Sequence, residues 1–254
     1  MVYVSITFRT EIGNGREDSM FMNINKQVDE FAATIRNDTS LAKGFNLVCH
    51  SQGGLIGRAY IERYNNPPVH NFITWSSPHG GQYGVPDFNA ICPDHTCPWL
   101  NEIFSWILEN GGEQIQDFIA FAAYWRDPLN ATTWVKTNNF LSDINNMREE
   151  KNSTYKANMV SLNAFLMMYT TADFIVVPKV SPWFEFFADG TDINPVPFRK
   201  TDTYQGDWIG LQTLDLAGKI ITKSCNCSHQ DYPRPDCKYV YDEYTAPLLN
   251  NTLP

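Results

Sequence analysis

The segment C-H-S-Q-G-G at residues 49–54 constrains the fold most, because it joins two different patterns of apolar residues. The short apolar run F-N-L-V-C that leads into it predicts a buried strand. The residues after it recur at helical spacing: Leu55, Ile56, Ala59, Tyr60 and Tyr64. A serine in a sharp strand-to-helix turn is the nucleophile elbow of α/β-hydrolases, where Oγ projects above the sheet edge. The sequence therefore predicts that Ser51 is a nucleophile.

A nucleophile elbow is crowded, so the residues two positions before and after the serine have to be small. Gly53 meets this requirement, and Cys49 stands in place of the usual glycine but is small enough to be tolerated. Gly54 is expected to allow close packing of the new helix against the sheet. The amide of Gln52 comes first in that helix, whose dipole favours negative charge at this end. We therefore expect the Gln52 N–H to donate to the oxyanion of a reaction intermediate.

A serine nucleophile needs a base to accept its proton, and histidine has a suitable pKa. In this fold the order along the chain is serine, acid and then histidine. The chain has five histidines, and of these only His229, in the loop S-C-N-C-S-H, follows the last predicted strand. His50 adjoins the nucleophile but is expected to point to the other side of the turn. The sequence therefore predicts His229 as the general base.

The acid that orients the base is expected in the loop after the predicted strand at residues 164–169. Asp173, in T-T-A-D-F-I-V-V-P, lies in that loop. A carboxylate beside a strand end can hold an imidazole in one tautomer. Glu185 lies among aromatic residues, and Asp189 and Asp192 lie further on in a predicted turn, D-G-T-D. We therefore expect Asp173 to complete a triad with Ser51 and His229.

Strand and helix patterns alternate along the chain, which favours the α/β class with a mostly parallel central sheet and helices on both faces. Apolar patterns predict strands at residues 2–8, 45–49, 69–75, 164–169 and 219–223. Helical patterns are expected over residues 25–37 and after Ser51, and a last amphipathic segment covers residues 239–249. No repeat or linker interrupts residues 1–254, which indicates a single domain. Residues 84–155 lack strand patterns and contain aromatic amphipathic segments, which predicts a helical insertion.

Charge and hydropathy exclude several classes of partner. The net charge of −9 argues against nucleic acid or an anionic membrane as the main partner. No run of about 18 apolar residues occurs, so no transmembrane span is expected. The N-terminus M-V-Y-V-S-I-T-F alternates apolar and polar residues and lacks the pattern of a signal peptide. Five N-x-S/T motifs are nevertheless candidate glycosylation sites: Asn37, Asn130, Asn152, Asn226 and Asn250.

The six cysteines fall into two local groups and one single residue. Cys92 and Cys97 flank the loop C-P-D-H-T-C, while Cys225, Cys227 and Cys237 cluster in another loop. Two local disulfides are expected, with Cys49 left as a buried free thiol in an apolar strand. A fully reduced protein is the alternative. Neither group offers four ligands at zinc-finger spacing, so no metal site is predicted.

Several segments occur in one order between about residues 3 and 249: C-H-S-Q-G-G-L-I-G-R-A, A-A-Y-W-R-D-P, F-L-S-D-I-N, D-F-I-V-V-P with W-F-E-F-F after it, and C-S-H. Together they resemble the palmitoyl-protein thioesterases, lysosomal enzymes that remove fatty acyl groups from cysteine thiols. The resemblance implies the same triad, Ser51, Asp173 and His229, and an oxyanion amide at Gln52. It also implies a lysosomal or secreted protein that acts without a cofactor on S-acylated proteins or peptides and acyl-CoA-like thioesters.

The resemblance further implies that the helical insertion forms the acyl groove. An apolar groove would set chain-length preference at about 0.8 kcal/mol per buried methylene. The pattern alone does not separate lining residues from core residues. Candidate lining residues are aromatic or aliphatic: Trp99, Ile103, Trp106, Phe118, Phe121 and Trp183.

The sequence departs from this family at its start. Family members carry an earlier strand that ends in an H-G-type loop and supplies the second oxyanion amide, and no such loop occurs here. The departure predicts an N-terminally incomplete domain, either a truncated form of a longer protein or an impaired enzyme. Two alternatives to a thioesterase therefore stay open, an acyl-binding protein with impaired catalysis and a lipase or esterase that acts on oxyesters.

Overall fold

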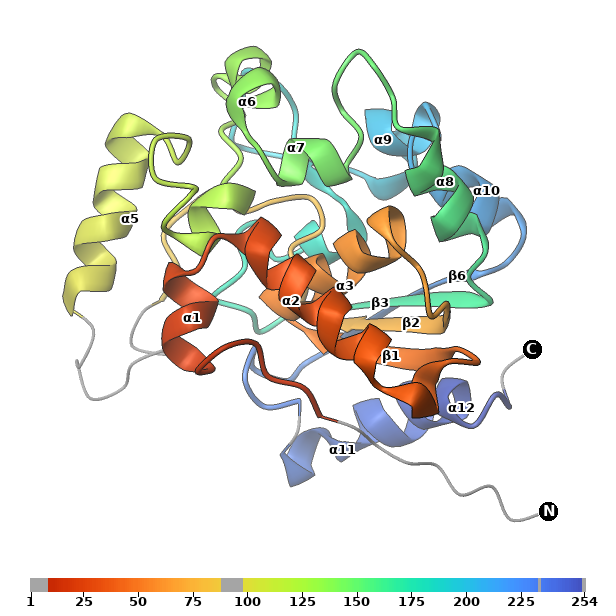
Figure 1. Ribbon diagram of the computed structural model, residues 1–254. Coiled ribbons are helices and arrows are strands. Elements are labelled where there is room, and N and C mark those ends of the chain that lie inside the picture. The colour runs from red at the N-terminus through yellow and green to blue at the C-terminus, as the bar shows by residue number, and fades with distance from the viewer. Residues whose placement is uncertain (1–8, 88–97, 233, 253–254) are drawn as a thin grey trace.

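A four-stranded parallel sheet forms the centre of the protein (Figure 1). The computed structural model describes residues 9–87, 98–232 and 234–252, so the strand predicted at residues 2–8 lies outside the described residues. The strand order is β1-β2-β3-β6, and each neighbouring pair is parallel. The strands are β1 (Phe45–His50), β2 (Val69–Trp75), β3 (Ala164–Thr170) and β6 (Ile220–Cys225). The predicted parallel sheet of the α/β class is confirmed, with strand ends shifted by one or two residues.

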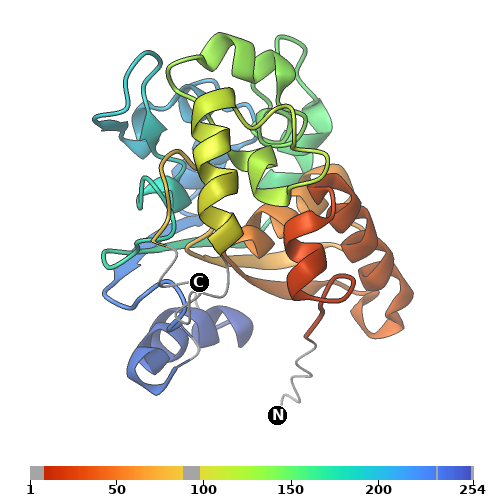
Figure 2. The same ribbon diagram turned by 90° about the vertical axis from the view of Figure 1, so that its left-hand side faces the viewer.

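Alternate residues of the strands supply two separate cores, because successive side chains of a strand point to opposite faces. Phe165 and Met167 of β3 belong to the large core under the helices that include α2 (Ile24–Asn37) and α3 (Gln52–Arg63). Leu166 lies on the other face and packs with Leu248 of the C-terminal segment. Figures 1 and 2 show the C-terminal helices on the opposite side of the sheet from α3 and the insertion. The predicted coverage of both faces is therefore confirmed.

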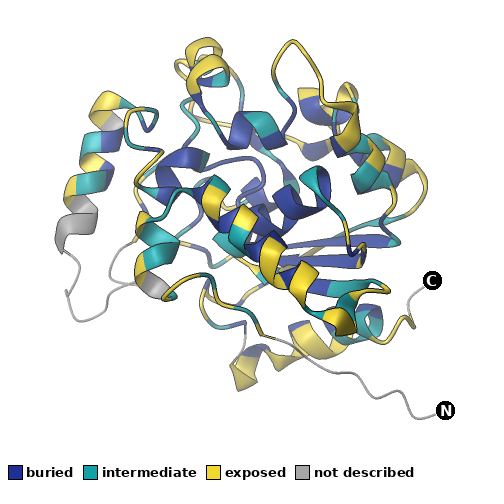
Figure 3. Cartoon of the chain, viewed as in Figure 1, coloured by how far each residue is buried: buried dark blue, intermediate teal, exposed yellow. Residues whose placement is uncertain are grey.

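Helix α2 illustrates why the predicted helices form. Asn23 caps its start, because the side-chain oxygen accepts hydrogen bonds from the N–H groups of Asn25 at 2.9 Å and Lys26 at 3.3 Å. Its apolar stripe is buried against the core, and its outer face is exposed (Figure 3). The buried stripe consists of Ile24, Val28, Phe31, Ala32 and Ile35. The helix predicted over residues 25–37 therefore begins one residue earlier, directly after the cap.

Between β2 and β3 the described residues form helices and turns. They are α5 (Pro98–Asn110), η2 (Ala120–Tyr124), α6 (Ala131–Thr137), α7 (Leu141–Ile144) and α8 (Ser153–Val160). The end predicted for the insertion, residue 155, falls inside α8. That helix starts at Ser153 because the side chain of Asn152 accepts a hydrogen bond from the Thr154 N–H at 3.0 Å.

The remaining elements are short. Before the sheet lie α1 (Arg16–Phe21) and η1 (Thr39–Leu41). A small antiparallel pair, absent from the sequence-based predictions, joins β4 (Phe186–Phe187) and β5 (Pro195–Val196). The amphipathic segment at residues 239–249 is helical in the structure, and its first helix starts at Lys238. The other elements are η3 (Ser181–Trp183), η4 (Phe198–Lys200), α9 (Asp202–Gln205), α10 (Leu211–Leu216), η5 (Pro235–Cys237), α11 (Lys238–Val240), the π-helical turn η6 (Tyr241–Thr245) and α12 (Ala246–Leu249).

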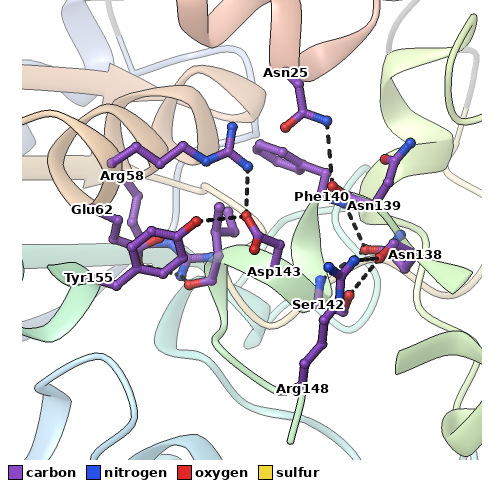
Figure 4. A network of polar contacts seen from close by, with 12 residues as sticks. Asn25, Arg58, Glu62, Asn138, Asn139, Phe140, Ser142, Asp143, Arg148 and Tyr155 are labelled. Carbon is purple, nitrogen blue, oxygen red and sulfur yellow. Dashed lines mark hydrogen bonds and ion pairs between the residues drawn. The ribbon is translucent and has the colours of Figure 1, made fainter. Parts of the chain in front are cut away.

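A buried ion pair ties α3 to the insertion. Arg58 and Glu62 are both fully buried, and Nη1 of Arg58 donates to Oε1 of Glu62 at 3.1 Å. The same nitrogen donates to the carbonyl oxygen of Ile144, in α7, at 2.9 Å. Nearby, Asp143 accepts from Arg63 at 2.8 Å and from the Tyr155 hydroxyl at 2.9 Å (Figure 4). These contacts fix α3 against α7 and α8 from the side opposite the sheet.

We expect Glu62→Ala to lower the free energy of unfolding by about 3–5 kcal/mol, because it leaves the Arg58 charge buried without its partner. Urea unfolding measures this change. Glu30→Ala is the matched control, since Lys26 and Glu30 form an exposed pair at the same i,i+4 spacing with 3.8 Å between N and O. The control is expected to change the free energy by less than about 1 kcal/mol. Equal losses in the two variants would contradict the stabilising role of the buried pair.

Candidate active site

Ser51 occupies a strained turn between β1 and α3, as the sequence predicts. Its φ and ψ are 54° and −131°, values that residues with a side chain rarely adopt. The Ser51 N–H donates to the Trp75 carbonyl at 2.9 Å, and its own carbonyl accepts from the Gly54 N–H at 3.0 Å. The turn is therefore held by β2 on one side and by the first turn of α3 on the other.

The crowded positions around this turn differ from those that the sequence predicts. A Cβ atom at Gly53 would meet no atom within 4 Å, so the expectation that Gly53 must be small is wrong. A Cβ at Gly54 would clash with the side chain of Ser77, which confirms the close helix packing expected there. At Gly57 an added Cβ would lie 2.8 Å from Sγ of Cys49. Helix α3 therefore approaches the sheet most closely along Gly54 and Gly57.

Three side chains far apart in sequence meet at the carboxyl edge of the sheet. Nε2 of His229 lies 3.0 Å from Oγ of Ser51, and Nδ1 of His229 lies 2.9 Å from Oδ2 of Asp173. Both distances are within the reach that proton transfer requires. His229 and Asp173 are buried, with 6% and 4% of their surfaces exposed. The three residues singled out in the sequence therefore form one hydrogen-bonded chain.

Asp173 is held ionised by its surroundings. Burial alone would raise the pKa of its carboxyl group. The hydrogen bond and charge of His229 and the backbone N–H groups of Val176 and Ile175 together outweigh burial and lower this pKa below the ordinary value. Those two N–H groups donate to Oδ1 at 3.0 and 2.8 Å. Asp173 can therefore accept a hydrogen bond from the Nδ1–H of His229 and fix the tautomer that leaves Nε2 free to act as a base.

The loop that carries His229 is cross-linked. Cys227 and Cys237 form a disulfide, which resolves the predicted three-cysteine group, and Cys225 stays a buried free thiol. Cys49 is free as predicted but only partly buried, and burial of its sulfur raises the pKa of the thiol to about 12. The other predicted pair, Cys92 and Cys97, lies outside the described residues. The Thr170 hydroxyl also donates to the Cys227 carbonyl, so the loop is joined to the end of β3.

Gln52 has two features, of which the sequence analysis anticipates one. Its backbone N–H is the first of α3, and the first N–H groups of a helix have no acceptor within the helix. Its side chain, in addition, donates to the Ser19 carbonyl at 2.8 Å and to Oε1 of Gln27 at 3.2 Å. Gln27 is buried and donates to the Met22 carbonyl at 2.8 Å. These amides attach α1 and the residue after it to the elbow, and nothing in the local pattern of Gln27 indicates this.

His50 is a second neighbour of the site that the sequence does not reveal. The expectation that it points to the other side of the turn is wrong, because its ring lies beside that of His229 with 4.9 Å between ring centroids. Nε2 of His50 is 2.7 Å from the carbonyl oxygen of His229. The alternative acids Asp189 and Asp192 are exposed, and none of their contacts reaches His229.

The candidate groove residues do not all lie together. Ile103, Trp106 and Phe121 pack in one apolar cluster with Phe104 and Trp125. Phe118 is 69% exposed and belongs to no such cluster. Trp183 packs against the main core instead, where its Nε1 donates to the Met167 carbonyl at 3.0 Å. The side chain of Trp99 lies outside the described residues. A pocket of about 590 Å³ is lined by residues of α6 with Arg148, Glu149 and Asp189, and it contains none of the groove candidates.

The five candidate glycosylation sites share an exposed position. Each acceptor asparagine is exposed in the structure: Asn37, Asn130, Asn152, Asn226 and Asn250. Among the described residues, no group of three or more His, Cys, Asp or Glu side chains is arranged to hold a metal ion. No helix in the same part of the chain is long and apolar enough to cross a bilayer.

Comparison with known proteins gives one consistent result. The sequence profile described as "Palmitoyl protein thioesterase" matches residues 1–229. Palmitoyl-protein thioesterase 3 of Dictyostelium discoideum is 41% identical over 242 residues, which cover 95% of this chain and 81% of that protein. Palmitoyl-protein thioesterase 1 of Caenorhabditis elegans is 33% identical, with 92% and 77% covered. A Drosophila melanogaster protein named lysosomal thioesterase PPT2 homolog is 32% identical, with 77% and 66% covered. The parallel sheet and the extent of these matches agree, and the chain belongs to the palmitoyl protein thioesterase family.

Proposed function

We propose that this chain hydrolyses long-chain acyl thioesters of protein cysteines through Ser51, with His229 as general base and Asp173 as orienting acid. The observation that carries the proposal is the hydrogen-bonded chain from Asp173 through His229 to Ser51, with distances of 2.9 and 3.0 Å. Membership of a family of thioesterases supports the choice of substrate.

The geometry supports a two-step reaction. Oγ of Ser51 attacks the thioester carbonyl carbon while Nε2 of His229 accepts its proton. The carbon–sulfur bond breaks, the sulfur departs as a thiolate that then takes the proton from His229, and the acyl group remains on Ser51. Water then attacks this ester, His229 passes the water proton to Oγ, and the fatty acid is released. The N–H of Gln52, the first residue of α3, would donate to the oxyanion formed in each step.

We infer that the helical insertion contributes the acyl groove. Support comes from the apolar cluster of Ile103, Trp106 and Phe121, which is separate from the main core. A lysosomal or secreted location is the second part of the proposal. The exposed acceptor asparagines and the Cys227–Cys237 disulfide suit an oxidising, glycosylating route. Three of the similar proteins, from fly, frog and mouse, also carry "lysosomal thioesterase" in their names.

Ser51→Ala is expected to abolish both turnover of a palmitoyl-thioester peptide and labelling by a fluorophosphonate probe, because the nucleophile is removed. Turnover is followed by thiol release, and labelling by mass spectrometry of the intact chain. Ser161→Ala is the control, since Ser161 is exposed and precedes β3, at the opposite edge of the sheet. Palmitate binding with no labelling of the wild-type chain would favour the alternative of an acyl-binding protein with impaired catalysis.

Asp173→Asn is expected to lower kcat by about 10³- to 10⁴-fold, because an amide can donate to Nδ1 and stabilise the wrong tautomer of His229. Steady-state hydrolysis of the same peptide measures the loss. Asp189→Asn removes the charge of an exposed aspartate in the same half of the chain and is expected to keep full activity. If the two variants have similar activity, Asp173 is not the orienting acid.

A palmitoyl thioester is expected to be hydrolysed with kcat/KM at least about tenfold above that of the matching oxyester. A thiolate leaves without protonation, whereas an alkoxide needs a proton from His229 in the transition state. Parallel assays on a cysteine peptide and a serine peptide of the same sequence provide the measurement. Preference for the oxyester would favour the lipase alternative, with the same triad in use.

A further inference from the structure

The position of His229 depends on more than its two catalytic contacts. An imidazole turns about two side-chain bonds, so a fixed ring also requires a fixed backbone. In the described part of the chain, the hydrogen bonds of His229 join it to Asp173, to Ser51 and, through its carbonyl oxygen, to His50. Of these three hydrogen bonds, the ring of His229 makes two, and its peptide group makes the one with His50.

Other contacts hold the same loop on both sides of His229. The disulfide of Cys227 lies upstream, and downstream the Tyr232 hydroxyl is 2.8 Å from Oγ of Ser76. The ring of Tyr232 also stacks on that of Trp75, with 5.4 Å between centroids. Around His229 itself, the Asp231 N–H donates to the Ser228 carbonyl at 3.1 Å and closes a turn. His50 adds the hydrogen bond that restrains the carbonyl of His229 directly.

The direction of this hydrogen bond follows from its acceptor. A carbonyl oxygen only accepts, so Nε2 of His50 carries the hydrogen and donates over 2.7 Å. His50 is the last residue of β1 and the immediate neighbour of Ser51. Two adjacent residues therefore hold the two ends of the base, because His50 binds its backbone and Ser51 binds its Nε2. A shift of the His229 backbone would lengthen the distance between Nε2 and Oγ directly.

We propose that His50 is a positioning residue whose Nε2–H···O=C bond to His229 keeps the base within reach of Ser51. The inference rests on the proposed function and adds a residue to it. His50 does not replace the base, because its Nε2 is committed to the carbonyl and Oγ of Ser51 is bonded to His229. Misplacing a catalytic group by about 1 Å costs on the order of 10²-fold in rate. Since Tyr232 and the disulfide restrict the loop, a smaller loss is expected when His50 is changed.

The test compares two substitutions that keep different features of His50. His50→Phe keeps an aromatic ring against Tyr232, which lies 5.7 Å away between centroids, but removes the donor. His50→Gln removes the ring and places an amide N–H near the position of Nε2. Palmitoyl-peptide hydrolysis and the rate of fluorophosphonate labelling are measured for both. His70→Phe is the control, because His70 is exposed on β2 and lies at the far end of that strand from the site.

His50→Phe is expected to lower kcat and the labelling rate by about 5- to 20-fold with KM within about twofold, a loss similar to that of one hydrogen bond. His50→Gln is expected to recover kcat to within about threefold of the wild type, and His70→Phe to match it. Full activity in His50→Phe overturns the proposal. Equal losses in His50→Phe and His50→Gln also overturn it, because ring packing would then be the cause.

A second pair covers the case in which His50→Phe does not fold, as judged by circular dichroism. His50→Asn and His50→Gln carry the same amide, but asparagine is one methylene shorter and falls short of the His229 carbonyl. The proposal expects His50→Asn to be the slower variant, and equal rates overturn it. A wild-type chain with neither turnover nor labelling would instead contradict the proposed function itself.

Discussion

Parallel pairing of the four strands is the constraint on which the candidate site depends. In a parallel sheet all carboxyl ends lie at one edge, and ligand sites of open α/β sheets form there. The register places His50 beside Trp75 and Thr170 beside Cys225, so the strands end at nearly the same level. The loops after β1, β3 and β6 consequently open next to one another. Residues separated by 178 and 56 positions meet there within hydrogen-bond distance.

This constraint explains why the sequence predicts the main side chains of the site. Ser51, Asp173 and His229 each follow a strand whose apolar pattern is local and easily recognised. The order of nucleophile, acid and base in this fold then assigns their roles without any knowledge of contacts. The same local patterns predict α2 and the four described strands to within one or two residues at most ends. Local pattern and topology together therefore predict the sheet, helix α2 and the three main side chains of the site.

Features that depend on packing between distant segments could not be predicted in this way. Gly53 looks essential from the motif, yet the close approach to the sheet occurs at Gly54 and Gly57. His50 and Gln27 carry no local pattern that indicates their partners, because those partners come from other loops. Which two of the three late cysteines pair also depends on the geometry of the loop after β6. Long-range contacts determine each of these features. The positions of Ser51, Asp173 and His229, in contrast, follow from where the strands end.

The buried charges of α3 have a different relation to the site. Arg58 and Glu62 gain little stability over apolar residues of similar volume, because both charges are removed from water. An apolar pair would, however, allow several orientations of α3 against α7. Nη1 of Arg58 can donate to both Glu62 and the Ile144 carbonyl in only one of them. Since Ser51 lies directly before the first residue of α3, the rotation and height of this helix also set the direction of Oγ. The ion pair thus acts on the nucleophile through helix placement, as His50 acts on the base through its peptide group.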